Sequence, residues 1–161
     1  MEQSTSNRMN SLISNDYIVK NFSELPTPFQ MAIIWYMAMD GIAWDLVDLS
    51  NINEDNFQKC FNDFLPNFVE IYGNKKFGIA HLNADKICDS VMQDPEIAEE
   101  FSSWTEYHAW YTSGSTPNHP DNDLWPVILS DDDSETIHDG WHRFHSYIRK
   151  NIATIPAVFF M

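Results

Sequence analysis

The chain has 161 residues, of which 43% are hydrophobic and 14% aromatic, so it can form one domain with a sizeable core and is not an intrinsically disordered polymer. The formal net charge of −15, with nine Lys and Arg in all, argues against direct binding to a nucleic-acid backbone, which needs clustered basic residues. The longest apolar run, residues 31–39, is too short to span a bilayer and no secretory signal is visible, so we expect a soluble cytoplasmic protein without a membrane partner.

The first half of the chain is expected to be helical. Residues 1–16 are rich in Ser and Asn, lack periodicity and predict a loose tail. A helix from Phe29 to about Asp40 is apolar nearly all round, which indicates a central buried helix that Gly41 ends. A clean amphipathic pattern predicts a second helix over residues 53–72, kinked or divided at Pro66. We therefore expect a helical N-terminal region over residues 17–74.

The second half alternates between strand and helix patterns. Residues 77–82 suit a strand, and a helix follows from Asn83. Asp94, Pro95 and Glu96 combine an N-cap, a first-turn proline and a first-turn acid, so one helix is predicted to begin there. One face of that helix would carry Ile97, Phe101, Trp104, His108 and Tyr111, with His108 as a half-buried structural histidine. Cys60 and Cys88 have neither ligand nor redox spacing and are expected to be buried thiols.

The C-terminal stretch predicts a strand, a turn, a strand, a helix and a strand. The strands fall at residues 125–129, 136–138 and 155–160, and the last of them is expected inside a sheet. Asp139 and Gly140 mark a sharp turn before the helix. The predicted fold class is α+β, a helical N-terminal half followed by a small mixed sheet over residues 75–161, in one compact unit.

The start of the C-terminal helix is a candidate anion site. A glycine turn that leads into a helix leaves N–H groups without acceptors, and these can bind a phosphate or a carboxylate. His142 and Arg143 lie in the first turn, and His145 and Arg149 fall on one polar stripe with His142. Only three arginines occur in the chain and two lie in this helix, so the local basic cluster is informative in a molecule this acidic.

The order of a strand, the segment Asp-Gly-Trp-His-Arg, a helix and an Ile-Pro-Ala-Val strand resembles the end of the ParB/sulfiredoxin-like domain, over about a quarter of the chain. In sulfiredoxins the loop is Gly-Gly-Cys-His-Arg, and the loop with its His-Arg pair binds nucleotide phosphates. The resemblance implies that Gly140, His142 and Arg143 are phosphate-binding positions. Trp141 takes the place of the cysteine that attacks oxidised peroxiredoxin, which argues against sulfiredoxin chemistry.

The first functional hypothesis is a ParB/sulfiredoxin-like protein that binds a nucleotide, with Mg²⁺, or a phosphate at the turn. Its binding residues would be Asp139, Gly140, His142, Arg143 and His145. The alternative for this cluster is structural, with Arg143 and Arg149 pairing with Asp139 or with the acids of residues 131–135. A metal site at His138, His142 and His145, with Asp139 as fourth ligand, is a further alternative, but we assign no metal. No catalytic residue is assigned, and whether the protein is an enzyme stays open.

The second hypothesis is a non-enzymatic acidic interaction protein. Acids cluster at residues 131–135, at Glu96, Glu99 and Glu100, and at Asp40, Asp45 and Asp48 with Glu54 and Asp55. Such clusters can form one interaction face that imitates nucleic acid, although solubility alone also explains them. The partner would be a basic nucleic-acid-binding protein. A phage- or plasmid-encoded inhibitor of the anti-restriction or anti-CRISPR type has this character.

Overall fold

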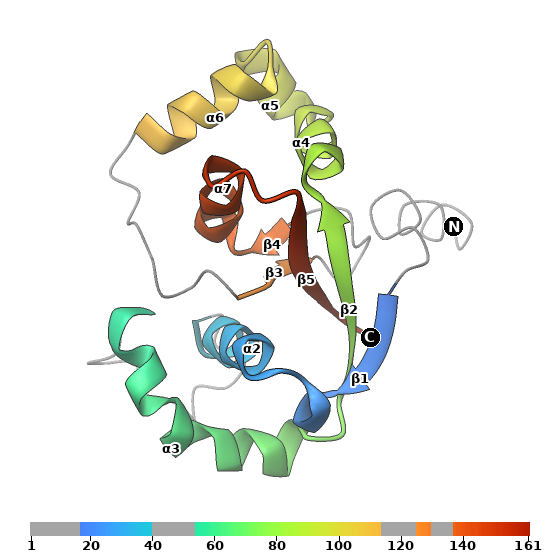
Figure 1. Cartoon of the computed structure of the whole chain (residues 1–161), viewed down its shortest axis with the longest axis vertical. Coiled ribbons are helices and arrows are strands. Elements are labelled where there is room, and N and C mark those ends of the chain that lie inside the picture. The colour runs from blue at the N-terminus through green and yellow to red at the C-terminus, as the bar shows by residue number, and fades with distance from the viewer. Residues whose placement is uncertain (1–16, 40–53, 114–124, 130–136) are drawn as a thin grey trace.

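A five-stranded mixed sheet forms the centre of the protein. The computed structural model describes residues 17–39, 54–113, 125–129 and 137–161. The sheet order is β1-β2-β5-β3-β4 (Figure 1), and every pair is antiparallel except β3 with β5. The strands are β1 (Tyr17–Asn21), β2 (Lys76–Asn83), β3 (Val127–Leu129), β4 (Ile137–Asp139) and β5 (Thr154–Phe160). Strands and helices together confirm the α+β class.

The C-terminal strand is the middle of this sheet, as the sequence predicts. β5 runs antiparallel to β2 on one side and parallel to β3 on the other. Ile155, Ala157 and Val158 have no exposed surface. Pro156 lies opposite His81 near the start of the strand, where the loss of one N–H donor is tolerated. The central residues of β5 therefore belong to the core.

Helices cover both faces of the sheet. Side chains alternate between two faces along a strand, and those of β2 and β5 enter two separate core clusters accordingly. Phe77 and Ile79 pack with α2 (Thr27–Met39) and α3 (Glu54–Tyr72). Ala80 and Leu82 pack with α4 (Ala84–Met92), α6 (Trp104–Ser113) and α7 (Trp141–Arg149). The predicted helix start sits on the second face, at the beginning of α7.

The N-terminal region is not wholly helical, and that expectation was wrong. Residues Tyr17–Asn21 form the edge strand β1, with Tyr17 opposite Ala80 of β2. A short 3₁₀ helix, η1 (Phe22–Glu24), follows and carries the chain into α2. Five residues are too few to show a hydrophobic period in the sequence. The strand conformation of β1 depends on pairing with β2, which lies more than fifty residues away in the chain. The expected tail over residues 1–16 and the helix end at Gly41 lie outside the described residues.

The two N-terminal helices match their predicted character. α2 is buried along Ala32, Ile33, Ile34 and Met37, as expected for a central helix. α3 is one helix that contains Pro66, so it bends rather than divides, and Figure 1 shows its change of direction. Phe61 and Phe68, on either side of the proline, both pack into the same core cluster. That shared packing offsets the hydrogen bond that proline removes.

The single helix predicted from Asp94 is instead two helices. α5 (Pro95–Glu100) begins with the predicted Asp94 cap, but Phe101 is extended and a second helix, α6, begins at Trp104. The Oγ of Ser103 accepts the N–H of Glu106, and the Glu106 carboxylate accepts from Ser102. This Ser-x-x-Glu arrangement is a capping box in which the backbone donor to the glutamate is Ser102 instead of Ser103, and it starts a new helix.

Candidate functional site

Gly140 has a structural reason to be glycine. It is the N-cap of α7 with φ +99°, a left-handed conformation that other residues adopt only with strain. A Cβ on this residue would lie 2.7 Å from the Nη2 atom of Arg143. The turn therefore needs glycine both for its backbone and for the room that the arginine occupies.

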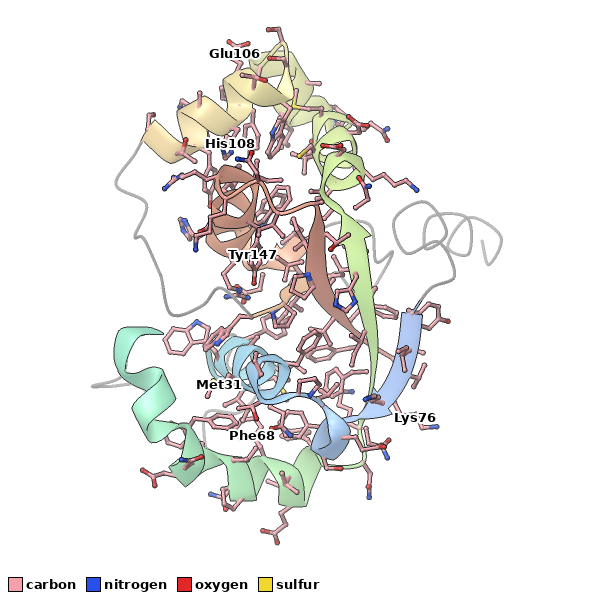
Figure 2. The ribbon with its side chains drawn as sticks, viewed as in Figure 1. Met31, Phe68, Lys76, Glu106, His108 and Tyr147 are labelled. Carbon is pink, nitrogen blue, oxygen red and sulfur yellow. The ribbon has the colours of Figure 1, made fainter. Side chains whose placement is uncertain are left out.

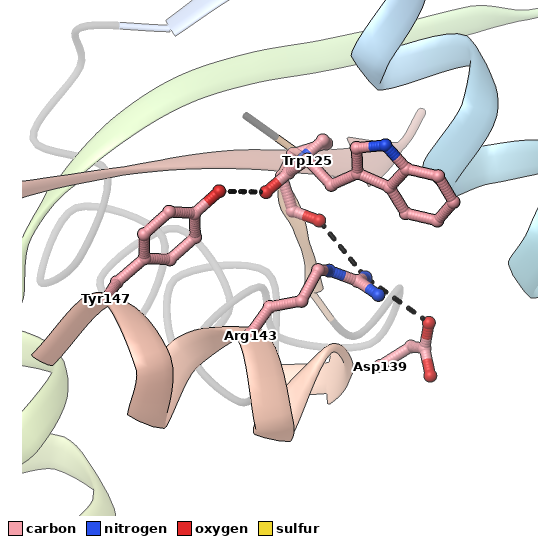
Figure 3. A network of polar contacts seen from close by, with 5 residues as sticks. Trp125, Asp139, Arg143 and Tyr147 are labelled. Carbon is pink, nitrogen blue, oxygen red and sulfur yellow. Dashed lines mark hydrogen bonds and ion pairs between the residues drawn. The ribbon is translucent and has the colours of Figure 1, made fainter. Parts of the chain in front are cut away.

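Arg143 points into the protein, and its side chain is 5% exposed (Figure 3). Its Nη2 donates to the carbonyl of Pro126 at 3.2 Å and lies 3.5 Å from the Oδ2 of Asp139. Its guanidinium also lies over the indole of Trp125, 5.5 Å from the ring centre. One turn later, the hydroxyl of Tyr147 donates to the carbonyl of Trp125. Two side chains of α7 thus fasten this helix to the segment that enters β3.

The ion pair between Asp139 and Arg143 corresponds to the structural alternative for the basic cluster. Asp139 ends β4 with a side chain that is 37% exposed. A carboxylate at this position repels an incoming phosphate while it neutralises the arginine. The sequence predicted that these residues lie close together. The guanidinium of Arg143, however, is directed at protein groups and not at the position of a phosphate.

His142 and His145 face α6 instead of the turn. His145 is 2% exposed, and its Nδ1 lies 2.8 Å from the Nδ1 of His108. Figure 2 shows His108 on the side of α6 that faces α7. His142 is exposed and contacts the hydroxyl of Tyr111 through Nδ1 at 3.3 Å. The five predicted binding residues therefore divide into Asp139, Gly140 and Arg143 at the turn and two histidines at the α6 interface.

Aromatic rings enclose the pair formed by His108 and His145. Trp104 and Tyr111 both stack on His145, with ring planes 9° and 12° from parallel. Burial, together with the positive charge of His108, His142 and Arg149, lowers the pKa of His145 to about 3. Burial and Arg149 also lower the pKa of His108. Both rings are neutral at neutral pH, so one Nδ1 donates and the other accepts.

The three histidines of the metal alternative do not converge, since His142 and His145 face α6 and His138 lies against α2. His138 of β4 is exposed and meets the ring of Tyr36 edge-on at 5.3 Å. The 2.8 Å between the Nδ1 atoms of His108 and His145 is a hydrogen-bond distance, whereas two nitrogens each about 2.0–2.1 Å from a tetrahedral zinc lie farther apart. Within the described residues, no group of three or more His, Cys, Asp and Glu is placed to hold a metal ion.

Exposed acids gather on the helices that follow β2. We call these exposed acids of α4, α5 and α6 together the acidic face; its residues are Asp85, Asp89, Asp94, Glu96, Glu99, Glu100 and Glu106. All seven are exposed, and Lys86 is the one lysine or arginine on the same helices. The sequence singled out the three glutamates of α5. It missed Asp85 and Asp89, whose signal is their position away from the buried Ile87 and Val91. The acids of residues 131–135, those of residues 40–48, and the side chains of Glu54 and Asp55 lie outside the part of the chain that the structure describes.

Comparison with protein-family models, curated proteins and solved structures finds no match to this chain. The resemblance to the ParB/sulfiredoxin-like domain accordingly stays a prediction. Among the described helices, none is both long enough and apolar enough to pass through a membrane.

Proposed function

We propose that this chain is a non-enzymatic acidic interaction protein that binds a basic, nucleic-acid-binding partner through the acidic face. The observation that supports the proposal is the exposure of all seven carboxylates of that face beside a single lysine. By contrast, the arginine that would bind a phosphate is buried among Trp125, Pro126 and Asp139.

The acidic face has two features that suit a nucleic-acid-binding surface, which are negative charge and an exposed aromatic side chain. Rows of exposed carboxylates create a negative potential that speeds the approach of a basic protein. Trp110 of α6 is 60% exposed and lies against Phe101, with ring centres 5.2 Å apart. Exposed tryptophans often anchor interfaces, so Trp110 supplies apolar contact area beside the charges. This combination suits a phage- or plasmid-encoded inhibitor whose partner is a nuclease.

The test measures binding to purified basic nucleic-acid-binding proteins, including a restriction endonuclease and an RNA-guided nuclease, with duplex DNA as competitor. We expect DNA and the protein to compete, and affinity to fall steeply with salt because charges are screened over about 8–10 Å near physiological ionic strength. Glu99→Lys/Glu100→Lys should slow association by about tenfold or more.

The matched control is Asp63→Lys/Glu70→Lys, which reverses two exposed acids on α3, on the opposite side of the sheet. It changes the net charge equally but leaves the acidic face intact, so it should slow association much less. Equal slowing by the two variants would mean that net charge alone acts. If no protein of the panel binds at low salt, the proposal is abandoned.

Nucleotide or phosphate binding at residues 139–143 is the second candidate. The observation in its favour is the start of α7 at Gly140, where first-turn N–H groups have no intrahelical acceptor. Calorimetry with ATP, CTP and GTP in the presence of Mg²⁺ tests it. Binding by the parent that Arg143→Ala abolishes would support this candidate, and no heat with any nucleotide would end it.

A further inference from the structure

A pocket of about 500 Å³ lies beside the acidic face, between α4 and the segment that joins α7 to β5. Three parts of the chain that are distant in sequence form its wall: the start of α4, Trp104 of α6 and the end of α7 with its following turn. The lining residues are Asn83, Ala84, Asp85, Cys88, Asp89, Trp104, Ile148, Asn151, Ile152 and Ala153. None of the sequence-based hypotheses included this pocket.

The lining combines an apolar interior with negative charge. Ala84 and Cys88 are buried and Ile148 is half-buried, so they provide an apolar wall. The indole of Trp104 adds an aromatic surface. Asp85 and Asp89 are exposed and lie one helical turn apart, so both carboxylates can approach the same bound group.

We propose that this pocket receives an arginine or lysine side chain from the partner of the acidic face. A basic side chain has an apolar stem that packs on alanine and isoleucine and a cationic head that two carboxylates and an indole stabilise. Arginine suits the arrangement best, because its planar guanidinium stacks on aromatic rings and bonds carboxylates through a fork. An anionic group would be repelled, and a neutral apolar group would leave the two charges without a counter-ion.

The inference rests on the proposed function, since Asp85 and Asp89 belong to both the acidic face and the pocket. A partner that lies across the acidic face brings its own basic residues to the pocket entrance. Interfaces commonly derive most of their affinity from a few anchor side chains in pockets, surrounded by weaker contacts. The pocket would thus bind the anchor side chain of the partner, and the remaining carboxylates of the acidic face would speed the approach of that partner.

The thiol of Cys88 in the wall of the pocket does not point to a reactive site there. Burial, together with the negative charges of Asp85 and Asp89, raises the pKa of this thiol to about 12. The thiol therefore stays protonated at neutral pH and is a poor nucleophile.

The experiment uses small probes, so that it does not depend on knowing the partner. N-acetyl-arginine amide is titrated into the ¹⁵N-labelled protein, and N-acetyl-citrulline amide, its neutral isostere, is the control ligand. We expect amide shifts that saturate and are centred on Ala84, Asp85, Cys88 and Ala153, with citrulline binding at least about tenfold more weakly because it lacks the charge. Equal shifts with both probes, or shifts centred elsewhere, would overturn the inference.

Two charge-matched variants separate the pocket from general acidity. Asp85→Asn/Asp89→Asn should weaken arginine-probe binding by about tenfold or more, whereas Glu99→Gln/Glu100→Gln removes the same charge and should weaken it by about twofold or less. Ala153→Leu places bulk at an exposed lining position without changing charge and should also weaken binding. Circular dichroism and thermal melting verify folding. Equal losses in the two charge variants would contradict the pocket.

The two proposals can fail separately. Probe binding in the pocket with no binding to any protein of the panel would leave the pocket and remove the proposed function. Partner binding that is unchanged by Asp85→Asn/Asp89→Asn and by Ala153→Leu would leave the acidic face and remove the pocket as its anchor.

Discussion

His108 and His145 meet through their Nδ1 atoms at 2.8 Å, and this contact joins α6, which carries part of the acidic face, to α7. The hydrogen bond needs one neutral acceptor nitrogen, so a proton on both rings would leave two donors facing each other. The neighbouring His142 and Arg149 add positive charge to the same place. The attachment of α6 is therefore sensitive to acid.

Stability should fall as pH is lowered from about 6.5, the ordinary pKa of histidine. The folded pKa of His145 is lowered to about 3, so the unfolded chain binds more protons between these values and stability rises with pH across that window. At about pH 5 the loss from this group is at most about 2 kcal/mol, from about 1.4 kcal/mol per pH unit. Urea unfolding of the parent and of His145→Phe, which cannot titrate, measures it. Identical pH dependence in the two proteins would show that His145 is not the cause.

Arg143→Met should destabilise the fold by about 2–3 kcal/mol, because it leaves the buried carbonyl of Pro126 without its donor and removes the partner of Asp139. Arg149→Met is the matched control, since Arg149 is exposed on the same helix and its replacement should change stability by about 0.5 kcal/mol or less. Chemical denaturation of both variants gives the comparison. Equal effects would mean that Arg143 is not a structural residue and would revive the phosphate-binding hypothesis.

The C-terminal half could be predicted from the sequence because its signals are local. Asp94 caps a helix, Gly140 begins another and the apolar run of β5 marks a buried strand. The strand β1 could not be predicted, since its five residues owe their conformation to pairing with β2. The division between α5 and α6 was encoded by Ser103 and Glu106, but the helical spacing of neighbouring apolar residues concealed it.

The candidate site was predicted less well, for a physical reason. An arginine in the first turn of a helix has the same sequence pattern whether it faces solvent or the interior. The direction of Arg143 depends on Trp125 and Pro126, which only the folded chain brings beside it. The pocket likewise depends on α4, Trp104 and the end of α7 meeting in space. Neither the period of the hydrophobic residues nor the spacing of a motif indicates which distant elements pack together.

Gly78→Ala should destabilise the sheet, because a Cβ at this position would lie 2.2 Å from the ring of Phe159 on the paired strand. Overpacking of a core typically costs about 1–3 kcal/mol. Phe159→Leu alone should also destabilise the protein. The same substitution should destabilise the Gly78→Ala variant less than the parent, since the smaller side chain makes room for the added methyl group. A double-mutant cycle in urea measures this coupling. Simple additivity would show that the glycine is not there to accommodate the ring.

Ser103→Ala should loosen α6 and with it part of the acidic face. The Ser103 hydroxyl accepts the N–H of Glu106 at the start of the helix, and loss of such a cap costs about 1 kcal/mol. Hydrogen exchange should quicken along Trp104–Ser113 and remain unchanged in β5, because local opening need not involve the central strand. Ser103→Asp, which restores a capping oxygen, should return exchange to the parental rate. Uniform acceleration through β5 in Ser103→Ala would mean that α6 opens only when the whole domain unfolds.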